Sequence, residues 1–336
     1  MLFWINGFNF RRFLFRHNFL IFMKLYRILI LFYLTIITTI SHAAAPNKIR
    51  IGMLAFGTLA WELSTVNQQP NLAHSITLET QTFATPQAAE IALQADAVDV
   101  ILADWFWTAQ MRNQQHEYQF YPYSTTSGAL VVPANSPIHQ LSDLKGKRLG
   151  IAGGELDKNW RLLQALMKQQ HLDLATNSTP VFAAPPLLNQ QLLQGNIDAV
   201  LNYWHYAARL EIQGYKTLIN GQQIIQQLGF KTAIPSLGYV FKQSWAEKHP
   251  KLLIEFFKIT QPAKQLLCES DSAWQAILPL TQTPEIALQN RLRQRYCDGR
   301  IQQWGQEQQQ AAAQLYRLIA QDKAAVLPVG TFWNAE

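Results

Sequence analysis

The chain carries one sequence pattern twice, at an offset of 99 residues. Thr82-Phe83-Ala84-Thr85-Pro86 corresponds to Val181-Phe182-Ala183-Ala184-Pro185. The same offset relates further identical residues: Trp61 and Trp160, Leu93 and Leu192, Asp99 and Asp198, Leu102 and Leu201, and Trp105 and Trp204. Repetition of this kind indicates two copies of one supersecondary unit. Chance similarity between two unrelated units is the alternative, and the tryptophan matches at a single offset argue against it.

Each copy has the composition of a strand–helix–strand unit. A strand-like stretch ends in Phe, and Pro follows near the first helical turn, where its missing N–H costs little. An amphipathic segment comes next (88–95 and 187–194), and then a short apolar run (98–102 and 197–201) of the kind buried in parallel sheets. The alternation predicts two α/β lobes with right-handed crossovers.

Two strand-like segments, 125–133 and 234–241, are predicted to form the hinge crossings between the lobes. The predicted limits are 44–130 for the first part of lobe 1, 131–237 for lobe 2, and 238–336 for the C-terminal part of lobe 1 with a helical extension. Helices are expected over 252–268, 284–296 and 302–320. Their polar faces suit helices that pack onto the first lobe and face solvent on the other side.

Tryptophans cluster where the predicted strands end. In open α/β sheets, ligands bind beyond the carboxyl ends of the strands. Five of the nine tryptophans after residue 43 fall just past such ends: Trp61, Trp105, Trp107, Trp160 and Trp204. A single Trp is more often a core residue than a ligand contact. A set of five from both copies predicts an aromatic cleft between the lobes.

The first 43 residues have the organisation of a cleavable signal peptide. Lys24 and Arg27 precede an apolar run over 28–40, and Ser41-His42-Ala43 places small residues at the cleavage positions. The run is shorter than the ~20 residues that span a bilayer, and a retained membrane anchor is the alternative. Met23 is the expected start of translation. The segment predicts export to the periplasm.

The same segment accounts for the basic charge of the chain, formally +6. It holds five basic residues and no acidic residue, so 23 of the 28 Lys and Arg remain against 22 Asp and Glu. A nearly neutral mature chain has no excess of cations to neutralise phosphates. A nucleic-acid partner is therefore excluded.

Cys268 and Cys297 are the only cysteines. In an oxidising periplasm a disulfide between them would close a loop, which stabilises a fold by roughly 3 kcal/mol. The sequence does not show whether their Cα atoms approach, so the paired and the free states both stay open. Their spacing matches neither a zinc site nor a CxxC redox motif, and no metal site is predicted.

Two motifs lie within and after the first predicted crossing: Gly128-Ala129-Leu130-Val131-Val132-Pro133, and Leu141-Ser142-Asp143-Leu144-Lys145-Gly146-Lys147-Arg148-Leu149-Gly150. They resemble the substrate-binding proteins of nitrate/sulfonate/taurine-type ABC transporters, a family that includes thiamine-pyrimidine binders. The resemblance covers nearly all of the chain after residue 43. Other motifs resemble a narrower subgroup, encoded beside PQQ-dependent alcohol oxidation systems: Phe56-Gly57-Thr58, Ala103-Asp104-Trp105, Gly153-Gly154-Glu155-Leu156-Asp157-Lys158, Ala184-Pro185-Pro186-Leu187-Leu188-Asn189, Trp204-His205-Tyr206-Ala207-Ala208-Arg209 and Gly330-Thr331-Phe332-Trp333.

The resemblance implies a type II periplasmic binding protein fold, with two Rossmann-like lobes that close on a ligand in the cleft between them. It also implies a monomer that needs no cofactor, is not an enzyme, and delivers a small organic molecule to an ABC permease with its ATPase. The predicted ligand-binding residues follow strand ends or lie at the first crossing: Phe56, Gly57, Thr58, Trp61, Asp104, Trp105, Trp107, Thr126, Ser127, Gly153, Gly154, Asp157, Lys158, Trp160, Asn202, Trp204 and His205.

The charge of the ligand is predicted from the acids near the strand ends. Gly153-Gly154 before a helix start would suit an anion. Asp157, however, occupies a plausible N-cap position, where it competes for the same N–H groups and repels negative charge. Asp104 adds to that repulsion. We therefore expect a neutral or cationic organic ligand rather than a sulfonate. The alternative is that both acids only cap helices.

Two other functions are compatible with this fold. Thiamine-pyrimidine synthases share it and act as enzymes with a lysine-bound pyridoxal phosphate and a cysteine-rich iron site. Lys158 and His205 could take the lysine and histidine roles, but the chain has no Cys cluster. A binding protein that serves as a non-transport accessory or sensor is the other alternative. Adjacent permease and ATPase genes would favour transport over that role.

Overall fold

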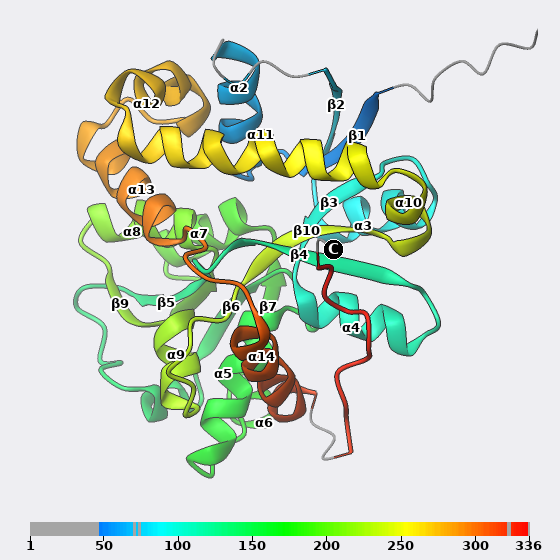
Figure 1. The fold of residues 1–336 in the computed structure, drawn as a ribbon. Coiled ribbons are helices and arrows are strands. Elements are labelled where there is room, and N and C mark those ends of the chain that lie inside the picture. Colours follow the sequence, from blue (N-terminus) through cyan, green and yellow to red (C-terminus); the bar gives the residue numbers. More distant parts are fainter. Residues whose placement is uncertain (1–46, 70–71, 73–74, 321–323, 335–336) are drawn as a thin grey trace, which may run out of the picture. The chain divides into compact units, whose positions relative to one another are not determined.

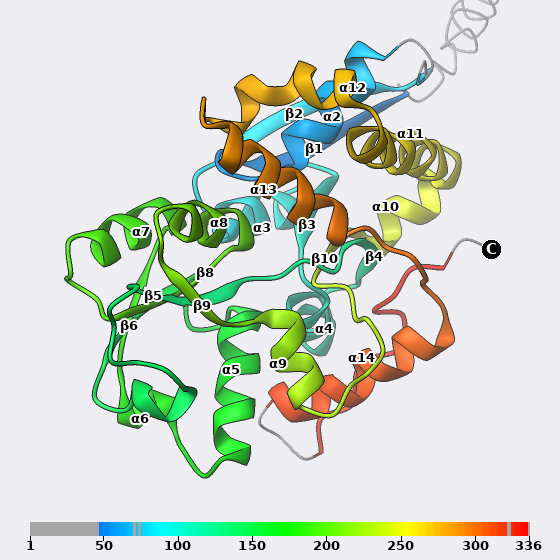
Figure 2. The same cartoon turned by 90° about the vertical axis from the view of Figure 1, so that its left-hand side faces the viewer.

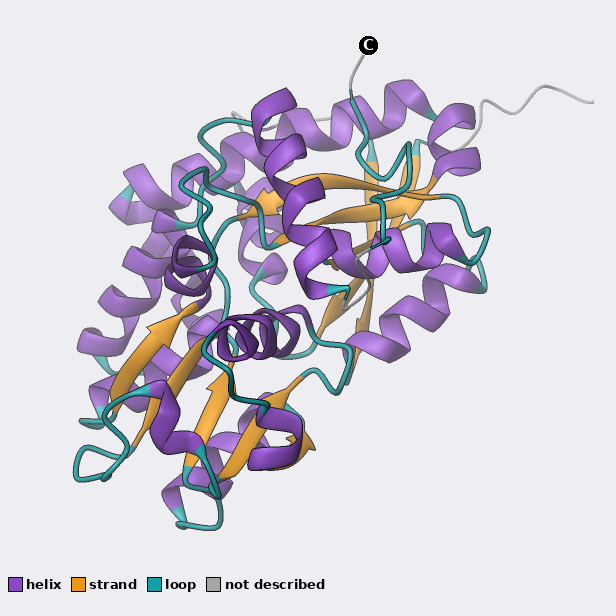
Figure 3. Cartoon of the chain, turned by 90° about the horizontal axis from the view of Figure 1, so that it is seen from below, coloured by secondary structure: helices purple, strands orange, loops and turns teal. Residues whose placement is uncertain are grey.

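The computed structural model describes residues 47–69, 72, 75–320 and 324–334 (Figure 1). These residues form two five-stranded sheets, seen as separate groups of strands in Figure 3. The first sheet has the order β2-β1-β3-β10-β4, with β1 at Lys48–Leu54, β2 at Thr77–Phe83, β3 at Val100–Ala103, β4 at Tyr118–Ser124 and β10 at Leu237–Lys242. The second has the order β7-β6-β8-β5-β9, with β5 at Ala129–Val132, β6 at Arg148–Ala152, β7 at Thr179–Ala183, β8 at Ala199–Asn202 and β9 at Lys216–Asn220.

Both sheets have the same topology. β1 pairs in parallel with β2 and β3, as β6 does with β7 and β8. β10 runs antiparallel to β3 and β4, as β5 does to β8 and β9. The chain passes from the first sheet to the second between Ser124 and Ala129, and it is back in the first sheet at Leu237. The predicted α/β lobes with two crossings are confirmed, whereas the lobe limits at residues 130 and 237 stay a prediction.

Helices flank both sheets (Figure 1). The first lobe contains α2 (Leu59–Gln68), α3 (Pro86–Gln94), α4 (Trp105–Asn113), α10 (Gln243–Lys248) and α11 (Pro250–Glu269). The second contains the short 3-10 turn η2 (Leu141–Leu144), α5 (Lys158–Gln169), α6 (Leu174–Asn177), α7 (Pro185–Leu193), α8 (Trp204–Ile212) and α9 (Gly221–Gln227). The C-terminal extension adds α12 (Asp271–Ile277), the 3-10 turn η3 (Leu278–Thr281), α13 (Ile286–Asp298) and α14 (Gln306–Ile319).

The repeated aspartates make the same contact in both lobes. Asp99 accepts hydrogen bonds from the backbone N–H of Arg50 at 2.8 Å and from its Nε at 3.1 Å. Asp198 accepts the corresponding bonds from Arg148 at 2.7 and 3.2 Å. Each contact joins the first strand of a lobe to the residue that precedes the third strand. The repeat in sequence is thus a repeat of structure.

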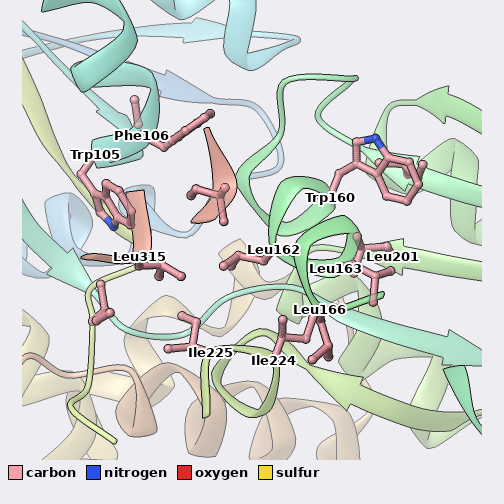
Figure 4. Packing of buried hydrophobic residues seen from close by; sticks show 14 of the residues in the cluster. Trp105, Phe106, Trp160, Leu162, Leu163, Leu166, Leu201, Ile224, Ile225 and Leu315 are labelled. Atoms are coloured by element: carbon pink, nitrogen blue, oxygen red, sulfur yellow. The ribbon is translucent and has the colours of Figure 1, made fainter. Parts of the chain in front are cut away.

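One hydrophobic cluster joins the two lobes. It includes Trp105 and Phe106 of α4, Trp160 of α5, Ile225 of α9 and Leu315 of α14 (Figure 4). Because its members come from both lobes and from the C-terminal extension, any rotation of the lobes has to leave this cluster packed or open part of it. The crossings therefore lie beside a continuous core.

The three predicted C-terminal helices are present as α11, α13 and α14, but two of them do not pack only on the first lobe. α11 lies against α2, as expected, whereas α13 contacts α8 (Figure 2) and α14 contacts α5. α14 also touches the first lobe, where the rings of Tyr316 and Phe106 lie 5.5 Å apart. Both helices therefore connect the lobes, because their apolar faces fill gaps between them.

Cys268 of α11 and Cys297 of α13 form a disulfide, with their Cα atoms 5.6 Å apart. The bond fastens α13 to the first lobe. The predicted signal peptide, residues 1–43 with the expected start at Met23, lies outside the described residues and stays a prediction. Among the residues that the structure does describe, no helix is long and apolar enough to cross a membrane.

Candidate ligand-binding site

Two aspartates begin helices at the carboxyl ends of strands in opposite lobes. Asp104 follows β3 and caps α4 by accepting the N–H of Trp107 at 2.9 Å. Asp157 follows β6 and caps α5, where its Oδ1 accepts the N–H of Asn159 at 2.8 Å and of Trp160 at 3.2 Å. The predicted N-cap role of Asp157 is confirmed. Both acids cap helices with one oxygen each, and each keeps a second oxygen for other contacts.

Lys158 interacts through its charge with both of these acids. Burial lowers the pKa of its ammonium, and the charges of Asp104 and Asp157 oppose that shift. Only 3% of Lys158 is exposed. Within the described part of the chain, it makes no hydrogen bond and no ion pair as short as 4.0 Å. The charges of Asp104 and Asp157 therefore offset part of the cost of burying this ammonium.

The acids near Lys158 have raised pKa values. Burial raises the pKa of Asp157 to about 7, and the charge of Asp104 acts in the same direction. Burial also raises the pKa of Asp104, against the influence of Lys158. Glu90 of α3 joins them, because burial and then the charge of Asp104 raise its pKa to about 7. Asp104 and Asp157, from opposite lobes, therefore interact with the ammonium of Lys158, and Glu90 interacts with Asp104.

Tyr203 completes this interlobe polar cluster, which we define as Glu90, Asp104, Asp157, Lys158 and Tyr203. Burial raises the pKa of the Tyr203 phenol well above its usual range, and the charges of Asp157, Asp104 and Glu90 raise it further. The phenol therefore stays protonated and can donate a hydrogen bond. The loop beside it bends at Gly153, whose φ is +89°. A Cβ there would lie 2.5 Å from Asp157 Oδ2 and 2.8 Å from the Tyr203 hydroxyl, so only glycine fits.

Aromatic rings from both lobes lie next to the cluster. Phe56, in the loop after β1, has its ring 6.4 Å from that of Tyr203 and 6.1 Å from that of Tyr206. His205 packs against Tyr206 at 4.8 Å. Burial lowers the pKa of His205 to about 3, and Arg209 adds to the effect while a backbone contact with Phe56 opposes it. Neither ring nitrogen has a well-aligned hydrogen-bond partner in the described chain.

Most of the predicted tryptophans do not line this site. Trp61, Trp105, Trp160 and Trp204 are all buried in hydrophobic clusters. Trp61 and Trp105 also donate their indole N–H to the carbonyls of Leu280 at 3.2 Å and Pro235 at 2.9 Å, so their burial carries no polar penalty. Trp107 is partly buried against Tyr118. These four residues pack in hydrophobic clusters, and their part in ligand binding stays a prediction.

Other predicted residues serve the hinge or the loops. Thr126 donates to the carbonyl of Arg295 in α13 at 2.9 Å, and the Ser127 hydroxyl donates to Asn159. Asn202 is buried and donates to the Pro185 carbonyl and to Asn189, at 2.9 and 2.8 Å. Gly57 and Thr58 form the turn into α2, where the Gly57 N–H donates to the Leu54 carbonyl at 2.9 Å. Gly154 has φ +94° beside Gln87.

Sequence reasoning did not select two members of the cluster, Glu90 and Tyr203, or the neighbouring Gln87. Gln87 donates to the carbonyl oxygen of Gly153 at 2.8 Å, which joins the lobes. Tyr203 directly precedes Trp204, and the preference for tryptophan concealed it. Glu90 lies in an amphipathic helix, where a polar residue normally indicates a solvent-facing position. The position of α3 at a strand's carboxyl end was the only available signal.

A large hollow of about 770 Å³ lies elsewhere, beside α11 and the segment 300–304. Its deepest acid, Glu62, is already satisfied by Tyr239 at 3.1 Å, Tyr296 at 2.5 Å and Lys264 at 3.6 Å. A second hollow of about 250 Å³ lies beside Thr126, Ser127 and α13. Neither hollow includes a residue of the interlobe polar cluster.

The topology places the chain among proteins with the type II periplasmic binding protein fold. The alkanesulfonate-binding protein SsuA from Xanthomonas axonopodis pv. citri, bound to MOPS, superposes with a TM-score of 0.66 at 20% identity, over 87% of this chain and 99% of that chain. The periplasmic aliphatic sulphonate binding protein SsuA from Escherichia coli gives 0.66 at 17% identity, over 85% and 96%. A ligand-binding component of an ABC-type import system from Staphylococcus aureus, with zinc bound, gives 0.65 at 14%, over 85% and 96%.

The family model described as "NMT1/THI5 like" matches residues 120–271. Comparison with curated protein sequences gave no match. The predicted fold class is confirmed by these similarities. For metals, no three His, Cys, Asp or Glu side chains of the described chain are grouped so that they could hold an ion.

Proposed function

We propose that this chain is a periplasmic solute-binding protein of an ABC importer. It captures a small organic molecule by lobe closure and delivers it to a membrane permease with its ATPase. The observation that supports the proposal is the interlobe polar cluster. In it, the charge of Asp104 in one lobe interacts with those of Asp157 and Lys158 in the other. The solved proteins with this fold are described as binding proteins, which supports the same role.

The charge of the cluster favours a neutral or cationic ligand over a sulfonate. The cluster holds three acids and one ammonium, and the N–H groups at the start of α5 that would hold an anion are occupied by Asp157. The rings of Phe56, Tyr203 and Tyr206 supply apolar and cation-attracting faces beside these acids. Relatives that bind sulfonates thus differ from this chain in the ligand we propose.

The same proposal has three further parts, which rest on sequence motifs. They are export through the signal peptide, action as a monomer, and association with PQQ-dependent alcohol oxidation. The lobe mechanism follows from the crossings. A ligand that contacts both lobes binds the closed form better, and it shifts the equilibrium by that difference in affinity.

Mass spectrometry of protein purified from its own periplasm tests the function. We expect a retained small molecule, and we expect its removal to increase the radius of gyration in small-angle scattering. A protein that retains no solute and has the same radius of gyration after unfolding and refolding would contradict the proposal.

The enzymatic alternative has one observation in its favour, which is the lowered pKa of Lys158. A lysine that binds pyridoxal phosphate needs such a shift. The charges of Asp104 and Asp157 act against it. Adding pyridoxal phosphate and recording the absorbance spectrum separates the two functions, because only the enzyme would develop a stable cofactor band that depends on Lys158.

A further inference from the structure

Strand β4 lies at one end of the first sheet, and its outer edge is paired with a segment near the C-terminus (Figure 1). The N–H of Phe120 donates to the carbonyl of Thr331 at 2.8 Å, and the Phe120 carbonyl accepts the N–H of Trp333 at 2.9 Å. The bridge between Phe120 and Phe332 is parallel. Residues 328–333, which we call the edge cover, therefore lie beside β4 in the manner of a further strand.

The edge cover is anchored by two aromatic side chains. The ring of Phe332 lies 6.0 Å from that of Phe120. The ring of Trp333 lies 5.4 Å from that of Tyr121 and 5.3 Å from that of Phe257 in α11. Phe120 and Tyr121 are successive residues of β4, so their side chains point to opposite faces of the sheet. The cover therefore packs on both faces, as a strand does.

Arg112 of α4 fixes the start of the edge cover. Its Nε donates to the Val329 carbonyl at 3.0 Å, and its Nη1 donates to the Tyr118 carbonyl of β4 at 3.0 Å. Gly330 turns the chain beside this guanidinium with φ +80°. A Cβ at that position would lie 2.6 Å from Arg112 Nη2, so the turn requires glycine. One side chain thus connects the cover to the strand that it lies against.

Together these contacts close the outer edge of β4. In an edge strand, alternate residues direct their N–H and C=O groups away from the sheet, and here they are Tyr118, Phe120 and Pro122. The Tyr118 N–H donates to the carbonyl of His116 at 2.9 Å, and its carbonyl accepts Arg112. Both groups of Phe120 are bonded to the cover, and Pro122 has no N–H. No N–H of these three residues is left to pair with another chain.

The sequence of β4 explains why its edge needs a cover. An open strand edge is a template for pairing with another chain, and charged side chains are a usual protection against it. The edge strands β2 and β9 carry Glu79 and Lys216, whereas β4 reads Tyr-Gln-Phe-Tyr-Pro-Tyr-Ser and has no charge. Without the cover, the backbone groups of Phe120 and the apolar rings under Trp333 would face water.

We infer that the edge cover is an autoinhibitory contact that prevents β4 from pairing with β4 of a second copy of this chain. Two antiparallel copies of β4 centred on Phe120 would supply to each other the two hydrogen bonds that Thr331 and Trp333 now supply. Such pairing uses the same patch on both copies and closes at a dimer. This role does not depend on the bound solute and goes beyond the function proposed above.

Truncation after Leu327 removes the edge cover and tests this role. We expect the mass of the truncated chain, measured by light scattering during gel filtration, to double as its concentration rises from micromolar to submillimolar. The wild type should keep one mass. A peptide of residues 328–334 should return the truncated chain to that mass, because it adds a strand to the open edge.

Two results would overturn the inference. One is a truncated chain that still unfolds cooperatively but has the wild-type mass at every concentration. The other is growth beyond twice that mass, because twofold pairing leaves no edge of β4 open.

Trp333→Ala in the full chain provides the test if the truncated chain does not fold. It removes the ring that packs on Tyr121 and Phe257, and its mass should also double with concentration. Val329→Ala is the matched control from the same segment, since Val329 is 95% exposed, and it should behave as the wild type.

Hydrogen exchange separates opening of the edge from a general loss of stability. In Trp333→Ala at low protein concentration, we expect the N–H of Phe120 to exchange about tenfold faster or more. The N–H of Tyr121 is directed to β10 and should keep its protection. An equal loss of protection at the two positions, or a wild-type mass at the highest concentration, would contradict the inference.

Discussion

Gln87 of α3 donates a hydrogen bond of 2.8 Å from Nε2 to the backbone carbonyl of Gly153, and this bond joins the two lobes. Gln87 lies in the first turn of α3, which follows β2, and Gly153 directly follows β6, so both residues lie near the carboxyl ends of strands. The bond can exist only while the lobes are close, and it lies beside the interlobe polar cluster. Under the lobe-closure mechanism proposed above, this bond would act as a latch that stabilises the closed form.

Removing this latch should weaken ligand retention. A neutral hydrogen bond contributes about 0.5–1.5 kcal/mol net, so Gln87→Ala should speed ligand release by about 2- to 10-fold. The release rate of the retained solute, followed by mass spectrometry after dilution, measures this. Gln81→Ala is the control, since Gln81 is exposed on β2 and its side chain makes no contact across the lobes. Equal release rates for the two variants would show that the latch has no role.

The sequence predicted the framework of the fold because the repeat recorded contacts that both lobes need. Asp99 and Asp198 are repeated because each forms an ion pair with the arginine of the first strand of its repeat. The prolines at the starts of α3 and α7 are repeated because they follow equivalent strands. Such local and periodic signals specify where strands and helices occur and how the sheets are ordered.

The site was predicted only in part, because position past a strand end does not determine the direction of a side chain. Asp104, Asp157 and Lys158 were found by that rule, and the structure brings them together. The same rule selected Trp105 and Trp160, which fill the core instead. Gln87 was not predicted, since its bond to Gly153 depends on the approach of α3 to the other lobe, a long-range contact that no local pattern encodes.

The repeated aspartates should differ in their contribution to stability. The Asp99 side chain is 6% exposed and that of Asp198 is 31% exposed. Removing one partner from a buried ion pair leaves an uncompensated group, so we expect Asp99→Asn to lower the free energy of unfolding by about 2–3 kcal/mol. Asp198→Asn should lower it by no more than about 1 kcal/mol. Urea unfolding at pH 7 measures both, and equal losses would contradict the burial argument.

His205 should make the protein sensitive to acid. Its pKa is about 3 in the folded chain and near 6.5 when unfolded, so the unfolded state binds more protons between these values. The stability associated with neutral His205 is complete above pH 6.5 and is lost as the pH falls towards 3. Each pKa unit corresponds to about 1.4 kcal/mol, which makes the total loss a few kcal/mol.

His205→Phe removes this titration while keeping a planar ring of similar bulk. The difference in unfolding free energy between the wild type and the variant, measured with urea from pH 4 to pH 7, isolates the histidine because the other acids titrate in both proteins. We expect the unfolding free energy of the variant to rise relative to that of the wild type as the pH falls. A difference that is constant with pH would mean that His205 can be protonated in the folded state.

The disulfide should stabilise both the fold and the closed arrangement of the lobes, because it anchors α13 to α11. Beyond α13, the Gly299 carbonyl accepts the N–H of Thr125 in the first crossing at 2.9 Å. Within α13, Arg295 forms an ion pair with Glu211 of the second lobe. The helix thus fastens the first lobe, the hinge and the second lobe together.

Replacing both cysteines by serine should therefore act on stability and on closure. We expect the free energy of unfolding to fall by about 2–4 kcal/mol, the usual range for a native disulfide. We also expect the ligand-free chain to have a larger radius of gyration in small-angle scattering, since α13 would hold the lobes less firmly. A reducing agent should lower the thermal midpoint of the wild type and leave that of the double variant unchanged. If the double variant loses stability but keeps the radius of gyration, then α13 needs no covalent anchor to connect the lobes, and the disulfide only stabilises the first lobe.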